Sequence, residues 1–263
     1  MAAASLAVAD YSRFTRWHVM PDMESLVNAV SIFIYRAARQ AIAARRSFRM
    51  VLAGGATPRA VYRELADTDA DWARWQVYFG DECCLPVQHP ARNSVMAAAN
   101  WLDYVSIPPD NIHVIPAERG AVAAARMYAT LIDAARPFDL VLPGMGEDGQ
   151  TAGLFPGQRH GTVKSVQAVA GTPGRPADRV SLSSAALNDT AMVLALVTGM
   201  AKHHAVQRWQ RGEDLPIAHI HGRCGIDVYL DPAAAYGPPH LAQEGVGRAA
   251  KLEGSVVTGP YCQ

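Results

Sequence analysis

The sequence predicts an α/β fold: a single domain with a mostly parallel, doubly wound, Rossmann-like sheet and helices on both faces. Short apolar runs alternate along the chain with longer stretches whose apolar residues recur at helical spacing. Glycine-rich or polar segments follow several of these runs. Half of the 263 residues are hydrophobic, which is enough for one sizeable core. Strands that alternate with helices form parallel sheets, because each parallel crossover needs a long connection.

The first elements show this alternation. Residues 1–14 are short and apolar, and we expect them to form an N-terminal arm. Residues 23–46 predict a long amphipathic helix, and residues 48–53 predict a buried strand that enters a tight turn at Gly54 and Gly55. Thr57 is the expected N-cap of the next helix, because Pro58 suits a first helical position. That helix should end near residue 66.

The remaining elements continue the pattern. Strands are expected at 76–79, 111–115, 138–142, 165–169, 180–183, 192–198 and 226–230. Helices are expected at 94–104, 119–135 and 200–211. From residue 231 onward the chain is rich in Ala, Gly and Pro and has no periodicity. We therefore expect an α/β domain at 15–230 and a C-terminal tail at 231–263.

The charge balance limits the possible partners. Lys plus Arg equals Asp plus Glu at 24 each, so nothing favours nucleic acid or an anionic membrane surface. No apolar run approaches the roughly 20 residues of a membrane span. We expect a small-molecule partner, no nucleic acid, no membrane, and a monomer or small homo-oligomer.

The four cysteines have no metal-ligand spacing. Cys83 and Cys84 are adjacent, and Cys224 and Cys262 lie far along the chain. Without a CxxC pair or a Cys/His pattern, a metal site is not expected. Reduced thiols in a cytoplasmic protein are the simplest interpretation. A reactive or redox-sensing Cys83–Cys84 pair is the alternative.

Two short segments at predicted strand ends have the composition of ligand-binding turns. Backbone N–H groups around Gly54 and Gly55, with Ala56 and Thr57 ahead of a helix, suit a phosphate, although a plain strand-to-helix turn has the same pattern. Asp81 and Glu82 follow the next strand and can orient sugar hydroxyls. A solvated turn with an acidic helix cap is the alternative for this pair.

The segment 142–157 is the strongest candidate for a functional loop. Its five glycines exceed what turning the chain requires, and polar side chains stand among them. The group that we assign to a binding site comprises Gly146, Asp148, Gly149, Gln150 and Thr151.

This loop resembles the signature loop of the 6-phosphogluconolactonases, which typically reads Gly-Met-Gly-x-Asp-Gly-His-Thr-Ala-Ser-Leu-Phe-Pro. Residues 53–58 resemble the family's Ser-Gly-Gly-Ser-Thr-Pro turn, and Asp81-Glu82 resembles its Asp-Glu-Arg. Asn93, Arg179 in Arg-Val-Ser-Leu, Lys202 in a late helix and the Leu-Pro-Ile at 215–217 also match in order. The similarity covers about residues 15–230.

The resemblance implies hydrolysis of 6-phosphoglucono-1,5-lactone to 6-phosphogluconate in the oxidative pentose phosphate pathway, with no metal or organic cofactor. It implies catalytic roles for Gln150, Asp148 and Asp81. Substrate binding would then fall to the glycine turns and the matching polar and cationic residues: Gly54, Gly55, Ala56, Thr57, Glu82, Asn93, Gly146, Gly149, Thr151, Arg179 and Lys202.

Three departures fall on chemically important positions. Gln150 replaces the family's histidine base, and a carboxamide cannot accept the water's proton near neutral pH. Cys83 replaces an arginine, which removes a bidentate phosphate contact. Ala53 and Ala56 replace serines and remove two hydroxyl groups. We therefore expect a weakened lactonase.

Other residues are candidates to compensate. His160, His203 or His204 is a candidate replacement base, and Arg59 or Arg92 a further phosphate-binding cation. A non-catalytic phosphosugar-binding protein is the alternative function. An amino-sugar phosphate isomerase-deaminase ranks third, because Leu-Phe-Pro-Gly at 154–157 follows the lactonase form of the loop.

Overall fold

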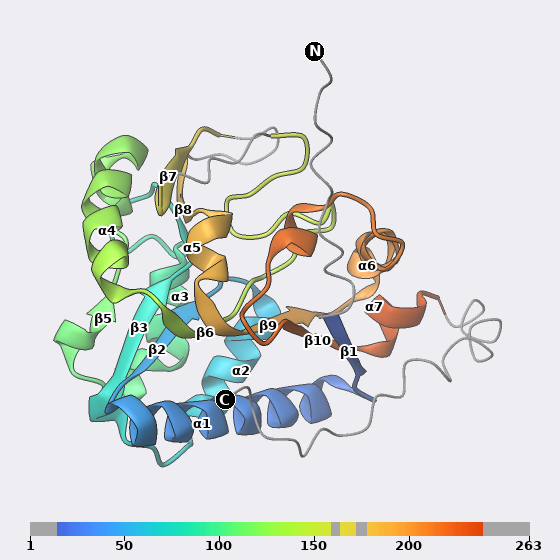
Figure 1. Cartoon of the computed structure of the whole chain (residues 1–263), viewed down its shortest axis with the longest axis horizontal. Coiled ribbons are helices and arrows are strands. Elements are labelled where there is room, and N and C mark those ends of the chain that lie inside the picture. Colours follow the sequence, from blue (N-terminus) through green and yellow to red (C-terminus); the bar gives the residue numbers. More distant parts are fainter. Residues whose placement is uncertain (1–14, 159–163, 172–177, 239–263) are drawn as a thin grey trace.

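The computed structural model describes residues 15–158, 164–171 and 178–238 of the 263-residue chain. Its centre is a seven-stranded sheet with the order β1-β10-β9-β6-β2-β3-β5, in which every neighbouring pair is parallel. A second sheet of three antiparallel strands, β4-β8-β7, stands beside it. Figure 1 shows α1 crossing under the large sheet and α5 on its opposite side. The α/β fold that the sequence predicts is therefore confirmed.

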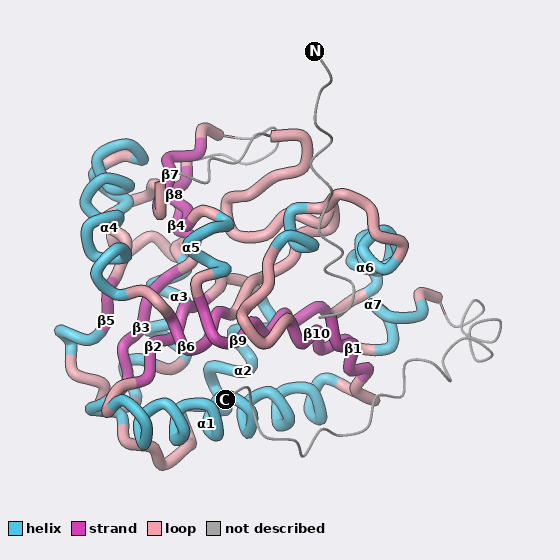
Figure 2. The backbone as a smooth tube through the Cα atoms, in the orientation of Figure 1, coloured by secondary structure: helices cyan, strands magenta, loops and turns pink. Residues whose placement is uncertain are grey.

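Helices separate successive strands of the large sheet along the described chain, as the tube view in Figure 2 shows. The strands are β1 Thr15–Val19, β2 Phe48–Leu52, β3 Trp75–Phe79, β4 Asp81–Cys83, β5 Ile112–His113, β6 Phe138–Val141, β7 Val166–Val169, β8 Arg179–Leu182, β9 Thr190–Val197 and β10 Ile226–Leu230. The α-helices are α1 Met23–Arg45, α2 Ala56–Ala66, α3 Asn93–Asn100, α4 Ala121–Ala135, α5 Ser184–Asn188, α6 His203–Gln210 and α7 Pro232–Tyr236. Short 3-10 turns join them, among them η6 at Met200–Lys202.

Local sequence accounts for the longest helix. The Asp22 carboxylate accepts a 2.7 Å hydrogen bond from the backbone N–H of Ser25 and caps the start of α1. The helix ends where Arg46 adopts a left-handed conformation with φ of 63°. Between these ends, Leu26, Val30 and Ile34 are fully buried against the sheet. None of the described helices is long and apolar enough to cross a lipid bilayer.

The sequences of the central strands are nearly continuous apolar runs, because other elements of the chain pack against both faces of the sheet. Met50, Val51 and Leu52 of β2 are each at most 1% exposed, and β9 buries its last five residues. The chain adds β3 and β5 on one side of β2, and β6, β9, β10 and β1 on the other. The direction in which successive strands are added to the sheet therefore changes between β2 and β6. In open α/β sheets, ligands bind at the carboxyl ends of the strands at such a switch point.

Two local expectations need correction, and one strand, β4, has no counterpart among the expected elements. Thr57 is not the N-cap of α2: Gly55 holds that position, and the Thr57 hydroxyl instead contacts the Thr198 hydroxyl at 2.6 Å. The predicted strand at 180–183 is correct, but its partner β4 has only three residues and shows no local periodicity. The folded chain also continues beyond residue 230, because α7 lies within the expected tail and packs against α6.

Candidate active site

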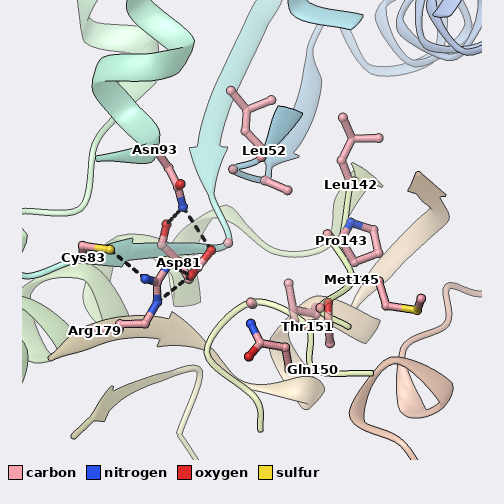
Figure 3. A pocket seen from close by; sticks show the side chains of 18 of the residues that line it. Leu52, Asp81, Cys83, Asn93, Leu142, Pro143, Met145, Gln150, Thr151 and Arg179 are labelled. Carbon is pink, nitrogen blue, oxygen red and sulfur yellow. Dashed lines mark hydrogen bonds and ion pairs between the residues drawn. The ribbon is translucent and has the colours of Figure 1, made fainter. Parts of the chain in front are cut away.

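A cavity of about 330 Å³ opens at the carboxyl ends of β2, β3, β6 and β9, which are neighbours in the sheet. Figure 3 shows how side chains from several strands converge on it. Nine of the residues assigned to the site from the sequence line this cavity together: Gly54, Gly55, Asp81, Asn93, Gly146, Gln150, Thr151, Arg179 and Lys202. The cavity thus brings the two glycine turns and both family-matching cations into one place.

The turn after β2 requires glycine at two positions. A Cβ on Gly54 would lie 1.9 Å from Oδ1 of Asn93, so this backbone can approach its neighbour only without a side chain. Gly55 has a φ of 110°, which side-chain-bearing residues rarely adopt. Just before the turn, the buried Tyr62 hydroxyl donates to the Ala53 carbonyl at 2.8 Å and accepts from the Ala53 N–H at 3.1 Å. This two-way contact holds the end of β2, and burial raises the pKa of Tyr62.

Arg179 lies on the cavity wall and is held from two sides. Its guanidinium forms an ion pair with Asp81, with Nε 3.0 Å from Oδ2, and also donates to the Cys83 sulfur (Figure 3). The carboxylate of Asp81 raises the pKa of Arg179 further above its usual range. Asn93 steadies Asp81 from the other side, because its Nδ2 donates to the Asp81 carbonyl at 2.8 Å and reaches Oδ1 at 3.2 Å.

Lys202 supplies the second cation. It comes from η6, after β9, and is partly exposed on the cavity wall. Of the charged side chains that line this cavity, Arg179 and Lys202 are cationic and Asp81 is anionic. The lining therefore carries a formal charge of +1, which favours an anionic ligand within a protein that is neutral as a whole.

The loop after β6 is shaped by its own hydrogen bonds. The Gly146 N–H donates to the Gln150 carbonyl at 2.8 Å, and the Gln150 N–H donates to the Asp148 carboxylate at 3.0 Å. A Cβ on Gly146 would lie 2.2 Å from Cγ of Gln150, so glycine at 146 makes room for that side chain. The Thr151 hydroxyl is buried and has no hydrogen-bond partner in the part of the chain that the structure describes. An unpartnered buried hydroxyl at a cavity wall is a candidate ligand contact.

Glu82 lies outside the cavity, so its assignment to substrate binding is wrong. It is fully buried and accepts hydrogen bonds from the backbone N–H groups of Cys83, Asn93 and Ser94 and from the Ser94 hydroxyl, at 2.7–3.0 Å. Its carboxylate therefore closes the N-terminus of α3, as the alternative of an acidic helix cap implied. Arg92 is 1% exposed and pairs with Glu82 and Glu118, so it is a structural cation and not a phosphate ligand.

Four further assigned residues do not reach the cavity wall. Ala56 and Thr57 belong to the first turn of α2, and Gly149 lies against Leu215. Asp148 is exposed and holds the backbone of the loop by its contact with Gln150. The wall also contains apolar residues to which the sequence assigned no individual binding role: Leu52, Leu142, Pro143, Met145, Ala152 and Leu187.

The candidate replacement bases are not in the cavity either. The Nδ1 of His203 contacts the Ala234 carbonyl at 3.1 Å on α7, and His204 is exposed. No described histidine lines the cavity, and His160 lies outside the described residues. Arg59 is exposed on α2 and does not line the cavity. No group of three or more His, Cys, Asp or Glu side chains among the described residues could hold a metal ion.

Comparisons with known proteins agree with this geometry. The family model described as glucosamine-6-phosphate isomerases/6-phosphogluconolactonase matches residues 21–228. A 6-phosphogluconolactonase from Synechocystis is 34% identical over 198 residues, which cover 72% of this chain and 82% of the relative. One from Mycobacterium leprae is 31% identical and covers 81% and 92%. The crystal structure of a 6-phosphogluconolactonase from Thermotoga maritima superposes with a TM-score of 0.78 at 25% identity, over 82% of this chain and 99% of that one. This chain belongs to the glucosamine-6-phosphate isomerase/6-phosphogluconolactonase family.

Proposed function

We propose that the protein hydrolyses 6-phosphoglucono-1,5-lactone to 6-phosphogluconate, the second step of the oxidative pentose phosphate pathway. The observation that carries this proposal is the single cavity that unites the 142–151 loop with the Gly54 turn, Arg179 and Lys202. Its formal charge and size suit an anionic sugar. We propose that the protein acts in the cytoplasm, without a metal or organic cofactor, as a monomer or small homo-oligomer.

The arrangement of polar groups supports one orientation of the substrate. We place the phosphate between Lys202 and the glycine turn at the start of α2, where backbone N–H groups and the helix dipole favour an anion. Lys202 suits this role because it has no ion-pair partner among the described residues, whereas Arg179 is already paired with Asp81. The lactone ring then lies beside Gln150 and the unpartnered Thr151 hydroxyl.

In the proposed reaction, water attacks the lactone carbonyl carbon and the bond from that carbon to the ring oxygen breaks. One proton of the water passes by way of a base to the ring oxygen, and the carboxylic acid that forms releases the other proton to solvent. Asp81 is the one carboxylate among the residues that line the cavity, so we assign it the proton of the attacking water. Gln150 orients that water through its carboxamide, and Asp148 supports it by holding the loop backbone. Arg179 holds Asp81 in place through their ion pair.

Replacing Lys202 with methionine should lower kcat/KM about 10- to 100-fold, because one charge-assisted phosphate contact is worth about 1.5–3 kcal/mol. The change should appear mainly as a higher KM, since the phosphate is remote from the reacting carbon. The assay follows the disappearance of freshly generated lactone against its spontaneous opening. Lys164→Met is the matched control, because Lys164 is exposed and lies outside this cavity. An equal loss in both variants would contradict the assignment.

The substitution at position 150 favours a second function, a phosphosugar-binding protein without turnover. Gln150 cannot accept a proton, and no described histidine lines the cavity. The two functions separate in one pair of measurements on the parent protein: binding of 6-phosphogluconate by calorimetry, and lactone opening above the spontaneous rate. Binding without any added rate would establish the second function and exclude the first.

Labelling of Cys83 by N-ethylmaleimide should be slow at neutral pH and should slow further when 6-phosphogluconate is bound. Burial raises the pKa of the Cys83 thiol, and Arg179 only partly offsets this, so little reactive thiolate is present at pH 7. The rate should therefore rise about tenfold per pH unit until the thiol titrates. Peptide mass spectrometry measures it, with Cys84 as the internal control, since Cys84 does not line the cavity. Equal protection of both thiols would indicate a general stabilisation instead of occupancy.

A further inference from the structure

The residue that follows β10, Asp231, connects the end of that strand to the turn after β9. Its Oδ2 accepts a hydrogen bond from the Gly199 N–H at 2.9 Å, and its Oδ1 is 3.1 Å from the same nitrogen. The same Oδ1 accepts from the Ala234 N–H at 2.8 Å and caps the start of α7. One carboxylate therefore joins two chain segments that lie 32 residues apart.

The Gly199 turn sets the position of Lys202. Gly199 has a φ of 91° and precedes η6, and its carbonyl accepts the N–H of Lys202 at 3.0 Å. The direction in which η6 leaves the sheet therefore follows from the backbone conformation of Gly199. Because the N–H of Gly199 is bonded to Asp231 and its carbonyl to the Lys202 N–H, a shift of the carboxylate would move the backbone that carries Lys202.

The remaining contacts of α7 support the same turn from behind. The Nδ1 of His203, the residue after Lys202, donates to the Ala234 carbonyl at 3.1 Å. Ala234 is fully buried, and a Cβ on Gly237 would lie 2.8 Å from Nε2 of His203, so the end of α7 fits closely against this ring. Figure 1 shows α7 beside α6 at the end of the sheet that carries β1 and β10.

From these contacts we infer that Asp231 is a positioning residue for Lys202, and that α7 belongs to the anion-binding apparatus of the site. The inference rests on the proposed function to the extent that Lys202 binds the substrate phosphate. Asp231 does not line the cavity and acts through the Gly199 turn.

Asp231→Asn separates this role from helix capping. Asparagine is as good an N-cap as aspartate, so α7 keeps its start. When the remaining oxygen takes the Oδ1 position and caps α7, the new NH₂ group replaces Oδ2 and faces the Gly199 N–H as a second donor, so Gly199 loses its 2.9 Å contact and keeps only the 3.1 Å contact with the capping oxygen. We expect Asp231→Asn to melt near the parent temperature, to bind 6-phosphogluconate about tenfold or more weakly, and to raise KM with little change in kcat. Asp231→Ala, which loses both contacts, should show the same binding defect with lower stability.

A double-mutant cycle with Lys202→Met gives the readout that a merely structural role would not produce. If Asp231 acts by placing Lys202, Asp231→Asn should cost little further affinity once Lys202 is methionine. Fully additive losses, or parent-like affinity in Asp231→Asn, would overturn the inference.

The inference can also be tested independently of the phosphosugar. Acetic anhydride labelling followed by mass spectrometry compares the reactivity of the Lys202 amine with that of Lys164. We expect Asp231→Asn to change the labelling of Lys202 by severalfold or more and to leave Lys164 unchanged. If the parent binds no 6-phosphogluconate, the proposed function fails, and this labelling alone decides the role of Asp231: unchanged Lys202 reactivity rejects it.

Discussion

Replacing Gln150 with histidine should raise kcat for lactone hydrolysis by about 10²-fold or more. Positioned general base catalysis typically contributes about 10²–10⁴-fold. In the parent, position 150 carries a carboxamide, and the base that we assign, Asp81, is held in an ion pair with Arg179. Gln150 is 8% exposed and lines the cavity, so a histidine of similar size would face the same space. Stopped-flow measurement of lactone disappearance gives the rate, and KM should change little because the phosphate contacts stay in place.

The pH profile identifies the source of any gain at position 150. A histidine base works only in its neutral form, so the added rate should be lost as the pH falls below about 6.5. Gln150→Asn is the control: it keeps a carboxamide, shortens its reach and should not increase the rate. A histidine variant with the parent rate at every pH would show that the site does not hold a reactive water beside position 150.

Replacing Glu82 with glutamine should cost about 3–5 kcal/mol of unfolding free energy, which is the usual penalty for breaking a buried ion pair. The carboxylate is fully buried, accepts four hydrogen bonds and lies 3.5 Å from Nε of Arg92. Glutamine keeps one acceptor oxygen, turns the other into a donor and leaves Arg92 with one fewer anion. Urea unfolding at pH 7 measures the change.

Glu118 provides the matched control for that measurement. It pairs with the same arginine at 3.0 Å, but its side chain is 31% exposed. Water can replace part of the lost contact, so Glu118→Gln should cost about 1 kcal/mol or less. If both variants lost the same small amount of stability, Glu82 would not be the anchor of α3. If Glu82→Gln strongly lowers the free energy of unfolding, it should also weaken ligand binding, because Asn93 at the start of α3 lines the cavity.

Much of the fold could be predicted because its signals are local. The spacing of Leu26, Val30 and Ile34 is enough to predict α1, and the apolar run at 48–52 is enough to predict β2. The short strand β4 has no local signal, because it exists only through pairing with β8, almost 100 residues away. Helix α7 has a local signal, Asp231 followed by proline, but the surrounding Ala-, Gly- and Pro-rich composition is typical of a tail.

The features of the candidate site also divide into those that local sequence predicts and those that only the tertiary structure places. The sequence alone determined the fold class, the glycine turns and the family, because backbone conformation and short motifs depend on neighbouring residues. It could not distinguish Asp81 from Glu82, which are adjacent in the chain. Only the tertiary structure decided that Asp81 faces the cavity while Glu82 caps α3, and that Asp231 supports the turn before Lys202. These roles depend on which side chains from distant segments meet, and that follows from the packing of the whole chain.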